Sequence, residues 1–337
     1  MPPIAQLHEA LAAQPRHLLA NLPTPVHELR RLSAELGGPR LLVKRDDLTG
    51  LATGGNKTRK LEFLLADAIA HGADCVITAG GPQSNHCRQT AAAAASMGLQ
   101  CHLVLGGDSG TIPRGNLFLD RLLGAEIHWT EKPLRNQLMD HLADQLKRNG
   151  KRPYTIPIGG SNEIGAIGYV AAMKELAQQL AELEVVVDEV VVATSSGGTQ
   201  AGMALGAAIT NCVGRVTGVS IDLEPNENFE QEIAAIANAT AQRLNLDAQL
   251  SPDDVKLLYG YLGGGYGVVG DLERDAIHSL ACSEGVLVGP VYTGRALGEL
   301  IGRIRQGAFN TEQTILFWHT GDESALHGYV EDVLPGA

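Results

Sequence analysis

Aromatic residues and charged residues are scarce in this sequence. Phe, Trp and Tyr together make up 4% of the 337 residues, and Asp, Glu, Lys and Arg make up 19%. Disordered chains are highly charged and poor in apolar residues, so the 44% of hydrophobic residues excludes that class. The length allows one large domain or two ordinary ones, each with a core of its own.

Positive charge and long apolar runs are also in short supply. Lys and Arg number 26 against 38 Asp and Glu, which gives a formal net charge of −12. Nucleic acid phosphates need clustered Lys and Arg, so we expect no nucleic acid partner and favour a small-molecule ligand. No stretch offers about 18 apolar residues in a row, and residues 1–23 contain no continuous apolar segment. We therefore expect no membrane partner and a cytoplasmic location.

Cysteine is too sparse and too scattered to predict a metal site. The five cysteines form neither a CxxC pair nor a cluster with histidine, so we expect no metal. Cys75 and Cys101 lie in apolar runs, where a thiol acts as a small buried hydrophobic group. Cys87 lies in a polar motif, but no base is evident for it and catalysis by this thiol is not favoured.

Short apolar runs alternate with longer segments in which apolar residues recur at helical spacing. The runs predict strands buried on both faces at residues 40–46, 75–80, 101–106, 153–159, 189–195, 215–221 and 314–320. The longer segments predict helices at residues 56–72, 86–98, 163–183 and 199–209. This alternation is typical of an α/β fold with a mainly parallel sheet, and the lack of a fixed-period repeat disfavours a solenoid.

Glycine, in contrast, is plentiful, with 40 residues concentrated in polar turns. The glycine-rich turns span residues 53–60, 78–86, 157–169, 193–202 and 263–267. Each turn alone is also explained by a need for positive φ. Because ligands bind beyond the carboxyl ends of parallel strands, several polar turns of this kind predict one shared site.

The segment SSGGTQAG (195–202) follows a predicted strand and opens an alanine-rich helix. Its small residues let backbone N–H groups approach an anion, and the hydroxyls of Ser195, Ser196 and Thr199 add donors. The segment is neither a Walker A loop nor a GxGxxG motif with a ribose-binding acid, so a nucleotide is unsupported. It predicts a phosphate site, with a purely structural turn as the alternative.

The segment GGNKTRKLEF (54–63) places a lysine at the start of a predicted helix. Asn56 is expected to cap that helix, which puts Lys57 in the first turn, where the helix dipole disfavours an ammonium ion. A neutral amine is the form that makes Schiff bases. The alternative is that Lys57, Arg59 and Lys60 form a solvated basic face.

The run QSNHCRQT (83–90) gathers hydroxyl, amide and imidazole groups just after a predicted strand. Such groups, with nearby backbone amides, can hold a carboxylate, which predicts a substrate site. Ser84 is a candidate for proton transfer or substrate binding, and Asn85 for a hydrogen bond to a ring oxygen. A polar helix cap explains both residues without chemistry, and His86 is equally well explained as a structural histidine.

The motifs together resemble a known family: the pyridoxal-phosphate enzymes of fold type II related to tryptophan synthase β. Within it, they resemble the branch of D-cysteine desulfhydrases and 1-aminocyclopropane-1-carboxylate deaminases. The resemblance runs from LPTPVHEL (22–29) to FWHTG (317–321). It is carried by LPTP (22–25), KRDD (44–47), GGNKTRKLEF (54–63), QSNH (83–86), GGSN with GAIGY (159–169), SGGTQAG (196–202), GYG (265–267) and PVYTG (290–294).

The resemblance implies an α/β fold with two open, mainly parallel domains and the cofactor pyridoxal 5′-phosphate between them. The large domain is expected to comprise residues 1–55 plus 171–337, and the small domain residues 56–170. Homodimers are usual in this family, so the chain is expected to be a homodimer that acts on a small amino acid.

The resemblance also implies roles for individual residues. Lys57 would bind the cofactor as a Schiff base and move the Cα proton, with Ser84 and Tyr292 as the other catalytic residues. Besides Lys57, the cofactor-binding residues would be Lys60, Asn85, Ser196, Gly197, Gly198, Thr199 and Thr293. The substrate-binding residues would be Ser84, Asn85, His86, Gly160, Tyr266, Tyr292 and Thr320.

Two threonines favour the desulfhydrases within this branch. Thr293 stands where deaminases resemble PVYEG, and a hydroxyl stabilises a protonated pyridine nitrogen less than a carboxylate does. Weaker electron withdrawal suffices for β-elimination but suits the opening of a cyclopropane less well. Thr320 also resembles the desulfhydrases, since deaminases tend to carry leucine there. The favoured reaction converts D-cysteine to pyruvate, sulfide and ammonia.

The sequence departs from the family pattern near the expected site. Gly289 stands where relatives commonly have aspartate, and residues 268–269 are Val-Val where relatives have Val-Pro or Ile-Pro. Gly321 and Asp322 replace a Gly-Gly pair, which places Asp322 close to the expected active site.

Three alternatives stand beside D-cysteine desulfhydration. L-cysteate sulfo-lyase is a relative with a similar N-terminal half, although the acidic segment 222–232 disfavours a strongly anionic substrate. 1-Aminocyclopropane-1-carboxylate deaminase is the second alternative. A non-catalytic pyridoxal-phosphate-binding protein is the third, and the joint presence of Lys57, Ser84 and Tyr292 argues against it.

Overall fold

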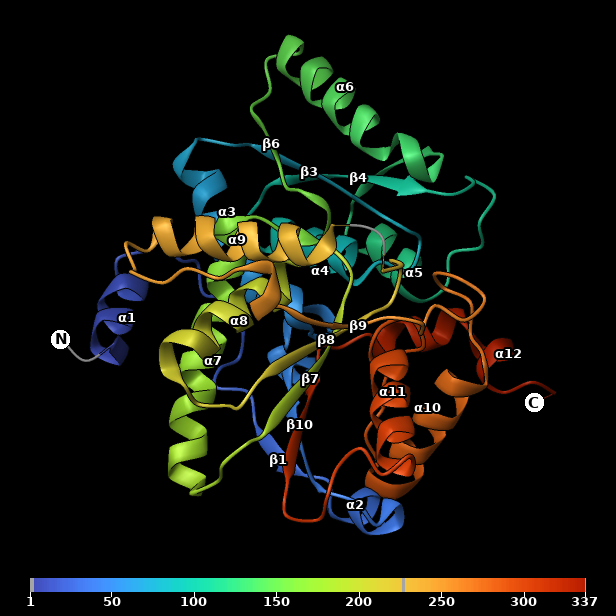
Figure 1. Ribbon diagram of the computed structural model, residues 1–337. Coiled ribbons are helices and arrows are strands. Elements are labelled where there is room, and N and C mark those ends of the chain that lie inside the picture. Colours follow the sequence, from blue (N-terminus) through green and yellow to red (C-terminus); the bar gives the residue numbers. More distant parts are fainter. Residues whose placement is uncertain (1–2, 226–227, 337) are drawn as a thin grey trace.

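The computed structural model of the chain describes residues 3–225 and 228–336, and within them the chain forms two β-sheets (Figure 1). The six-stranded sheet has the order β1 (Val26–Glu28), β2 (Arg40–Arg45), β10 (Thr314–His319), β7 (Glu189–Thr194), β8 (Val216–Ser220) and β9 (Lys256–Leu258). The four-stranded sheet has the order β5 (Glu126–Thr130), β4 (Gln100–Gly106), β3 (Cys75–Gly80) and β6 (Pro153–Thr155). Both chain ends thus contribute to the larger sheet, and the middle of the chain forms the smaller one.

The sheets are mainly parallel, which confirms the predicted α/β class. Only β1, at the edge of the six-stranded sheet, runs antiparallel to its neighbour β2. All pairs in the four-stranded sheet are parallel. Each predicted strand is present, although β6 is shorter than predicted because Pro157 and a 3₁₀ turn at Ile158–Gly160 follow it, and its residues are not fully buried.

Helices cover both sheets. They are α1 (Pro3–Ala12), α2 (Arg30–Leu36), α3 (Asn56–Ala70), α4 (Asn85–Ser96), α5 (Gly115–Leu122), α6 (Arg135–Arg148), α7 (Glu163–Leu183), α8 (Gly198–Thr210), α9 (Phe229–Arg243), α10 (Asp271–Glu284), α11 (Thr293–Arg305) and α12 (Val330–Val333). No helix within the described residues combines the length and apolar character that a membrane crossing requires.

The central strands of the larger sheet send alternate side chains into two cores, as the two-residue period of a strand requires. Val191 of β7 and Phe317 of β10 pack with α2, α10 and α11 on one face. Val190 and Trp318, their neighbours in the chain, pack with α7 and α8 on the other face. Burial on both faces explains why these strands read as continuous apolar runs in the sequence.

The smaller sheet is covered in the same way. Ile77 and Val104 pack against α6 on its outer face, which lies at the top of Figure 1. Val76 and Leu103 face inward to a core that also contains residues of α3, α4, α7, α8 and α9. A layer of helices between the two sheets therefore shares one continuous core.

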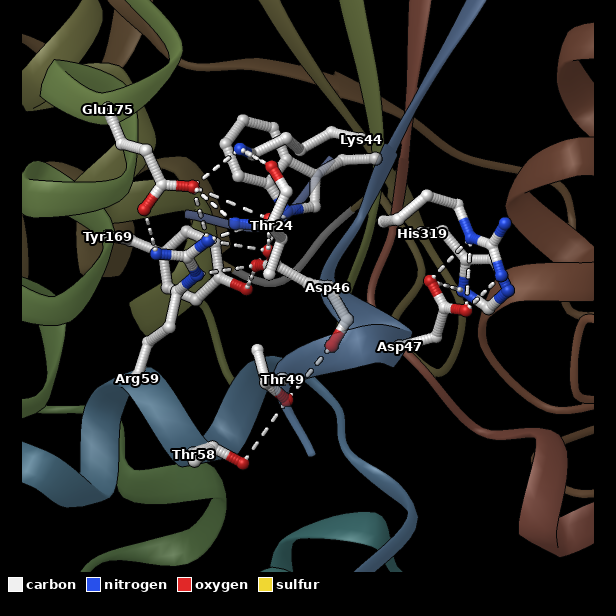
Figure 2. A network of polar contacts seen from close by, with 12 residues as sticks. Thr24, Lys44, Asp46, Asp47, Thr49, Thr58, Arg59, Tyr169, Glu175 and His319 are labelled. Atoms are coloured by element: carbon white, nitrogen blue, oxygen red, sulfur yellow. Dashed lines mark hydrogen bonds and ion pairs between the residues drawn. The ribbon is translucent and has the colours of Figure 1, made fainter. Parts of the chain in front are cut away.

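A buried polar network ties α3 to the larger sheet (Figure 2). Arg59 of α3 donates to both oxygens of Asp46, just after β2, at 2.8 and 2.9 Å, and to Glu175 of α7 at 2.9 Å. Asp46 also accepts hydrogen bonds from Tyr169 at 2.6 Å and from the indole of Trp318 at 2.9 Å. Burial alone raises the pKa of Asp46, but the charge and hydrogen bonds of Arg59 outweigh it and hold that pKa at about 2.

Replacing Asp46 by Asn is expected to leave the buried Arg59 with Glu175 as its one remaining carboxylate partner among the described residues. We expect the free energy of unfolding to fall by about 3–5 kcal/mol, measured by urea denaturation at pH 7. Asp275→Asn is the control, because Asp275 pairs with Arg305 on the surface and its loss should cost at most about 1 kcal/mol. Equal effects of the two substitutions would contradict a stabilising role for the network.

The same contact predicts a pH dependence. The pKa of Asp46 is lowered from its ordinary 3.8 to about 2 in the folded protein. The contribution of Asp46 to stability is therefore fully present at a pH above its pKa in the unfolded chain. It disappears as the pH falls through its pKa in the folded protein. The stability difference between wild type and Asp46→Asn should shrink between pH 4 and pH 2, in the same denaturation assay.

Candidate active site

A cleft of about 820 Å³ lies where the carboxyl ends of β3 and β7 meet the beginnings of α3, α4, α8 and α11. This is the position expected for a ligand site of a parallel sheet. The predicted site residues that line the cleft are Lys57, Ser84, Asn85, His86, Ser196, Gly197, Thr199, Tyr266, Tyr292 and Thr320. The fold therefore brings together residues separated by more than two hundred positions in the chain.

Lys57 is the second residue of α3. The N-cap of this helix is Gly55, at φ 126°, so the prediction that Asn56 caps it is wrong. Asn56 is the first helical residue, and its side-chain amide donates to the Thr199 hydroxyl at 3.0 Å. No hydrogen bond or ion pair of the Lys57 amine is found within residues 3–225 and 228–336. Burial lowers the pKa of Lys57 to about 8. The amine is thus available for covalent chemistry near neutral pH.

The predicted phosphate turn lies at the start of α8. The hydroxyl of Ser161 accepts from the Gly198 amide at 3.1 Å and from the Lys60 ammonium at 3.0 Å, and lies 2.8 Å from the Ser196 hydroxyl. Burial, and then the charge of Lys57, lower the pKa of Lys60 well below its usual range. Lys60 and Gly198 lie behind the cleft surface, in contact with the residues that form it. Donors from three segments thus converge at one helix N-terminus.

Ser84 and His86 lie at the beginning of α4. Ser84 is the N-cap of the helix, and its hydroxyl accepts from the Cys87 backbone amide at 3.2 Å. Ser84 therefore caps the helix and also lines the cleft. His86 pairs through Nε2 with the Thr78 hydroxyl at 2.8 Å. Burial and the nearby lysines lower the pKa of His86 well below its usual range, which keeps the imidazole neutral. Burial raises the pKa of Cys87 well above its usual range.

Asn85 is held by three neighbours. Its carbonyl oxygen accepts from Asn116 at 3.0 Å and from Arg88 at 3.3 Å, and its amide nitrogen donates to Asp322 at 2.8 Å. The direction of the amide is therefore fixed by the protein.

Two tyrosines form the opposite wall. The hydroxyls of Tyr266 and Tyr292 lie 2.7 Å apart, and their rings meet edge to face with centroids 6.1 Å apart. Burial raises the pKa of both phenols, so both are neutral hydrogen-bond donors and acceptors.

Three charged cleft residues were not identified as site residues from the sequence. The Lys132 ammonium lies 5.1 Å from the centre of the Tyr266 ring, and Arg135 lines the cleft beside it. Both follow β5, a strand that the sequence did not predict. Asp222, which accepts from the Ser195 hydroxyl at 2.8 Å, also lines the cleft and begins the acidic segment 222–232, of which residues 226 and 227 lie outside the described residues.

Besides Lys60 and Gly198, two more predicted site residues, Thr293 and Gly160, lie behind the cleft surface. The Thr293 hydroxyl accepts from the Gly289 amide at 2.9 Å and donates to the Gly321 carbonyl at 3.1 Å. A side chain at Gly160 would meet Leu64 at 2.9 Å and His86 at 3.6 Å, so this glycine lies next to His86. Thr320 lines the cleft, and its carbonyl accepts from the Asn56 amide at 2.9 Å.

The sequence and the fold were compared with those of known proteins. Residues 18–321 match a family model described as pyridoxal-phosphate dependent enzyme. D-cysteine desulfhydrases of Klebsiella pneumoniae (strain 342) and Salmonella choleraesuis (strain SC-B67) are each 43% identical to the chain, over 94% of its length and 96% of theirs. A solved structure described as that of an ACC deaminase homologue is 37% identical, with a TM-score of 0.89 over 97% of this chain and 98% of that one.

These matches cover nearly the whole chain and include every segment that contributes to the cleft. They confirm the resemblance to fold type II, the enzymatic nature of the protein and its cofactor. The chain belongs to the family of pyridoxal-phosphate-dependent enzymes.

Proposed function

We propose that the protein is a carbon–sulfur lyase that converts D-cysteine and water to pyruvate, hydrogen sulfide and ammonia. The observation that carries the proposal is the 43% identity to D-cysteine desulfhydrases over nearly the full length of both chains. The cleft supports the reaction class, because it places a weakly basic lysine, a hydroxyl-rich helix N-terminus and two neutral phenols around one space.

The residues at the start of α8 fit the phosphate group of the cofactor. A side chain at Gly198 would lie 2.6 Å from the Ser161 hydroxyl and 2.8 Å from the Lys60 ammonium, and one at Gly159 would collide with the Ser196 hydroxyl. Glycine thus keeps open a cradle lined by donors, as a phosphate ester requires. We propose that Lys60, Ser196, Gly197, Gly198 and Thr199 hold the phosphate and that Lys57 holds the ring. When bound, pyridoxal phosphate supplies an electron-accepting ring that stabilises negative charge at the substrate Cα.

Lys57 and Ser84 would act at the Cα end of the substrate. The lowered pKa of Lys57 leaves part of its amine neutral at physiological pH, so it can accept the Cα proton. Ser84, at the N-terminus of α4, would bind the substrate carboxylate together with the backbone amides of that helix.

Tyr292 and Tyr266 would act at the sulfur end. Because both phenols are neutral, one can donate a hydrogen bond to the departing sulfur while the other holds it in place through the 2.7 Å contact. We propose Tyr292 as the donor and Tyr266 as its support. Thr320 would contact the substrate from the end of β10, and His86 from the start of α4.

Lys132 and Arg135 give a second candidate function some support. Both cations line the cleft, so an anionic sulfonate would find ion-pair partners there. This arrangement gives L-cysteate sulfo-lyase more support than it has from the sequence. Asp222 lines the same cleft and opposes a substrate with an extra negative charge. D-cysteine therefore remains the better fit.

Three further proposals concern the whole protein. The division into residues 1–55 plus 171–337 and residues 56–170 follows the two sheets, since residues 75–155 provide all strands of the smaller one. A homodimer is proposed from the family resemblance, and light scattering that gives twice the chain mass of 35.6 kDa would support it. A cytoplasmic location is proposed because the sequence offers no stretch of about 18 apolar residues in a row.

The substrate is tested by adding D-cysteine, L-cysteine, L-cysteate and 1-aminocyclopropane-1-carboxylate separately to the cofactor-loaded enzyme. We expect sulfide and pyruvate from D-cysteine at a rate above those of the other three compounds. Sulfite from L-cysteate, or 2-oxobutyrate from the cyclopropane, as the main product would establish the corresponding alternative. Lys57→Ala should lower D-cysteine turnover about 10²–10⁴-fold. Lys147→Ala, on the exposed side of α6, is the matched control and should leave turnover unchanged.

The phosphate cradle is tested by Gly198→Ala. The added methyl group would displace Ser161 and Lys60, so pyridoxal 5′-phosphate should bind at least about tenfold more weakly, a cost of about 1.4 kcal/mol. Pyridoxal, which lacks the phosphate, should lose much less affinity. Gly302→Ala is the control, because nothing lies within 4 Å of a methyl group there. Both affinities are measured by fluorescence titration of the cofactor-free enzyme. Equal losses of affinity for pyridoxal 5′-phosphate and for pyridoxal would contradict the phosphate cradle.

A further inference from the structure

Asp322 is a buried carboxylic acid in a backbone conformation that few non-glycine residues adopt. It has φ 93° and no solvent exposure, directly after Gly321 at φ 96°. Left-handed backbone at a residue with a side chain is strained and persists only where surrounding contacts enforce it. The side chain of Asp322 makes such contacts.

The Asp322 carboxylate joins two walls of the cleft. One oxygen accepts from the Asn85 side-chain amide at 2.8 Å, and the other accepts from the Tyr292 backbone amide at 3.1 Å. Asn85 begins α4, and Tyr292 precedes α11. Both line the cleft, whereas Asp322 lies behind them.

These contacts determine which way Asn85 presents its amide. Burial raises the pKa of Asp322 to about 7, so at pH 8.5 its carboxylate is ionised and only accepts hydrogen bonds. The nitrogen of Asn85 therefore faces Asp322, and its oxygen is engaged by Arg88 and Asn116. The second N–H of Asn85 has no acceptor within the described residues, so a ligand in the cleft can accept it.

Gly289 lies directly against Asp322. A Cβ atom at position 289 would lie 2.1 Å from the backbone carbonyl oxygen of Asp322, 2.4 Å from its carboxyl carbon and 2.5 Å from its Cβ. Glycine at 289 is therefore required for the close approach of both the backbone and the side chain of Asp322.

We propose that Asp322 is a positioning residue that holds Asn85 and Tyr292 in the orientation required by the cofactor and substrate. The substrate part of this inference rests on the proposed function. The cofactor part rests on the contacts of Asp322 alone.

The test compares Asp322→Asn and Asp322→Gly with the wild type at pH 8.5. Asparagine has the shape of aspartate but offers only one acceptor oxygen, so one of the two contacts is lost. We expect Asp322→Asn and Asp322→Gly to shift the absorbance spectrum of the bound cofactor and to lower kcat for D-cysteine about 10–10²-fold. Glu323→Gln, a change in the adjacent acid, is the control and should alter neither.

Each outcome decides a separate statement. A wild-type spectrum and kcat in Asp322→Asn and Asp322→Gly would overturn the positioning role. Failure of the wild type to release sulfide from D-cysteine would count against the proposed function instead, and the cofactor spectra would still test the role of Asp322.

A second and independent inference concerns the edge of the smaller sheet. His102 of β4 lies opposite Glu126 of β5, and His128 follows two residues later on the same face of β5. The Nδ1 atom of His102 lies 3.3 Å from Nε2 of His128 and 3.4 Å from a carboxylate oxygen of Glu126, and His128 lies 3.5 Å from the other oxygen. Each imidazole thus lies next to a different oxygen of Glu126, and one ligand atom from each of the three side chains lies within 4.8 Å of the others.

The 3.3 Å between the two imidazole nitrogens matches the spacing of ligands in a tetrahedral metal site. Ligands at about 2.0–2.1 Å from a zinc ion lie about 3.3–3.4 Å from one another. The set of two imidazoles and one carboxylate is also one that zinc accepts, with water as a fourth ligand. We infer that His102, Glu126 and His128 bind a divalent transition-metal ion. No metal was expected from the sequence. The three residues come together only through the pairing of β4 with β5, a strand that the sequence did not predict.

Zinc binding to the holoenzyme, measured by competition with a chelating indicator, tests this site. We expect one ion per chain, with at least about tenfold weaker binding in Glu126→Gln and in His128→Gln. His141→Gln, an exposed histidine of α6, should bind zinc as the wild type does. No saturable binding, or binding that neither ligand substitution weakens, would overturn the inference.

Discussion

Arg59 pairs with Asp46 in the interior of the protein, and the direction of α3 depends on this contact. The pair joins α3 to the segment after β2, and Glu175, Tyr169 and Trp318 extend it to α7 and β10. A buried ion pair is costly to desolvate and strongly favours the one geometry in which all its hydrogen bonds form. Lys57 lies two residues before Arg59 on the same helix. The network thus holds the reactive amine at a fixed place above the larger sheet.

The same burial that makes Arg59 dependent on Asp46 makes Lys57 reactive. Arg59 remains charged because two carboxylates compensate its desolvation, whereas the Lys57 amine has no such partner within the described residues and its pKa falls to about 8. Two basic residues only two positions apart on one helix therefore have opposite roles, set by their neighbours. The N-termini of α4 and α8 add positive potential to the cleft without adding a titratable group.

Continuous apolar runs and glycine-rich turns made the central strands, their helices and most cleft residues predictable from the sequence. β1 and β9 were missed because three residues carry no periodic signal, and β5 because Glu126 and His128 interrupt its apolar pattern. Lys132 and Arg135 were missed for the same reason, since they follow β5. The prediction of Asn56 as the helix cap was wrong because the helix starts one residue earlier than expected. Its cap is Gly55, whose φ of 126° is a conformation that residues with a side chain rarely adopt. Contacts between distant segments, such as Asn85 with Asp322, have no local signature.

Thr293 shows how a motif residue can act without reaching the cleft. Family resemblance indicated it as a cofactor ligand, yet its hydroxyl is engaged by the backbone of Gly289 and Gly321. Those two glycines flank the space that the Asp322 side chain fills, and Asp322 in turn contacts Asn85 and Tyr292. Thr293 therefore stabilises the two turns that orient Asp322. A change at position 293 would reach the cofactor through the backbone of these turns as well as through any direct contact.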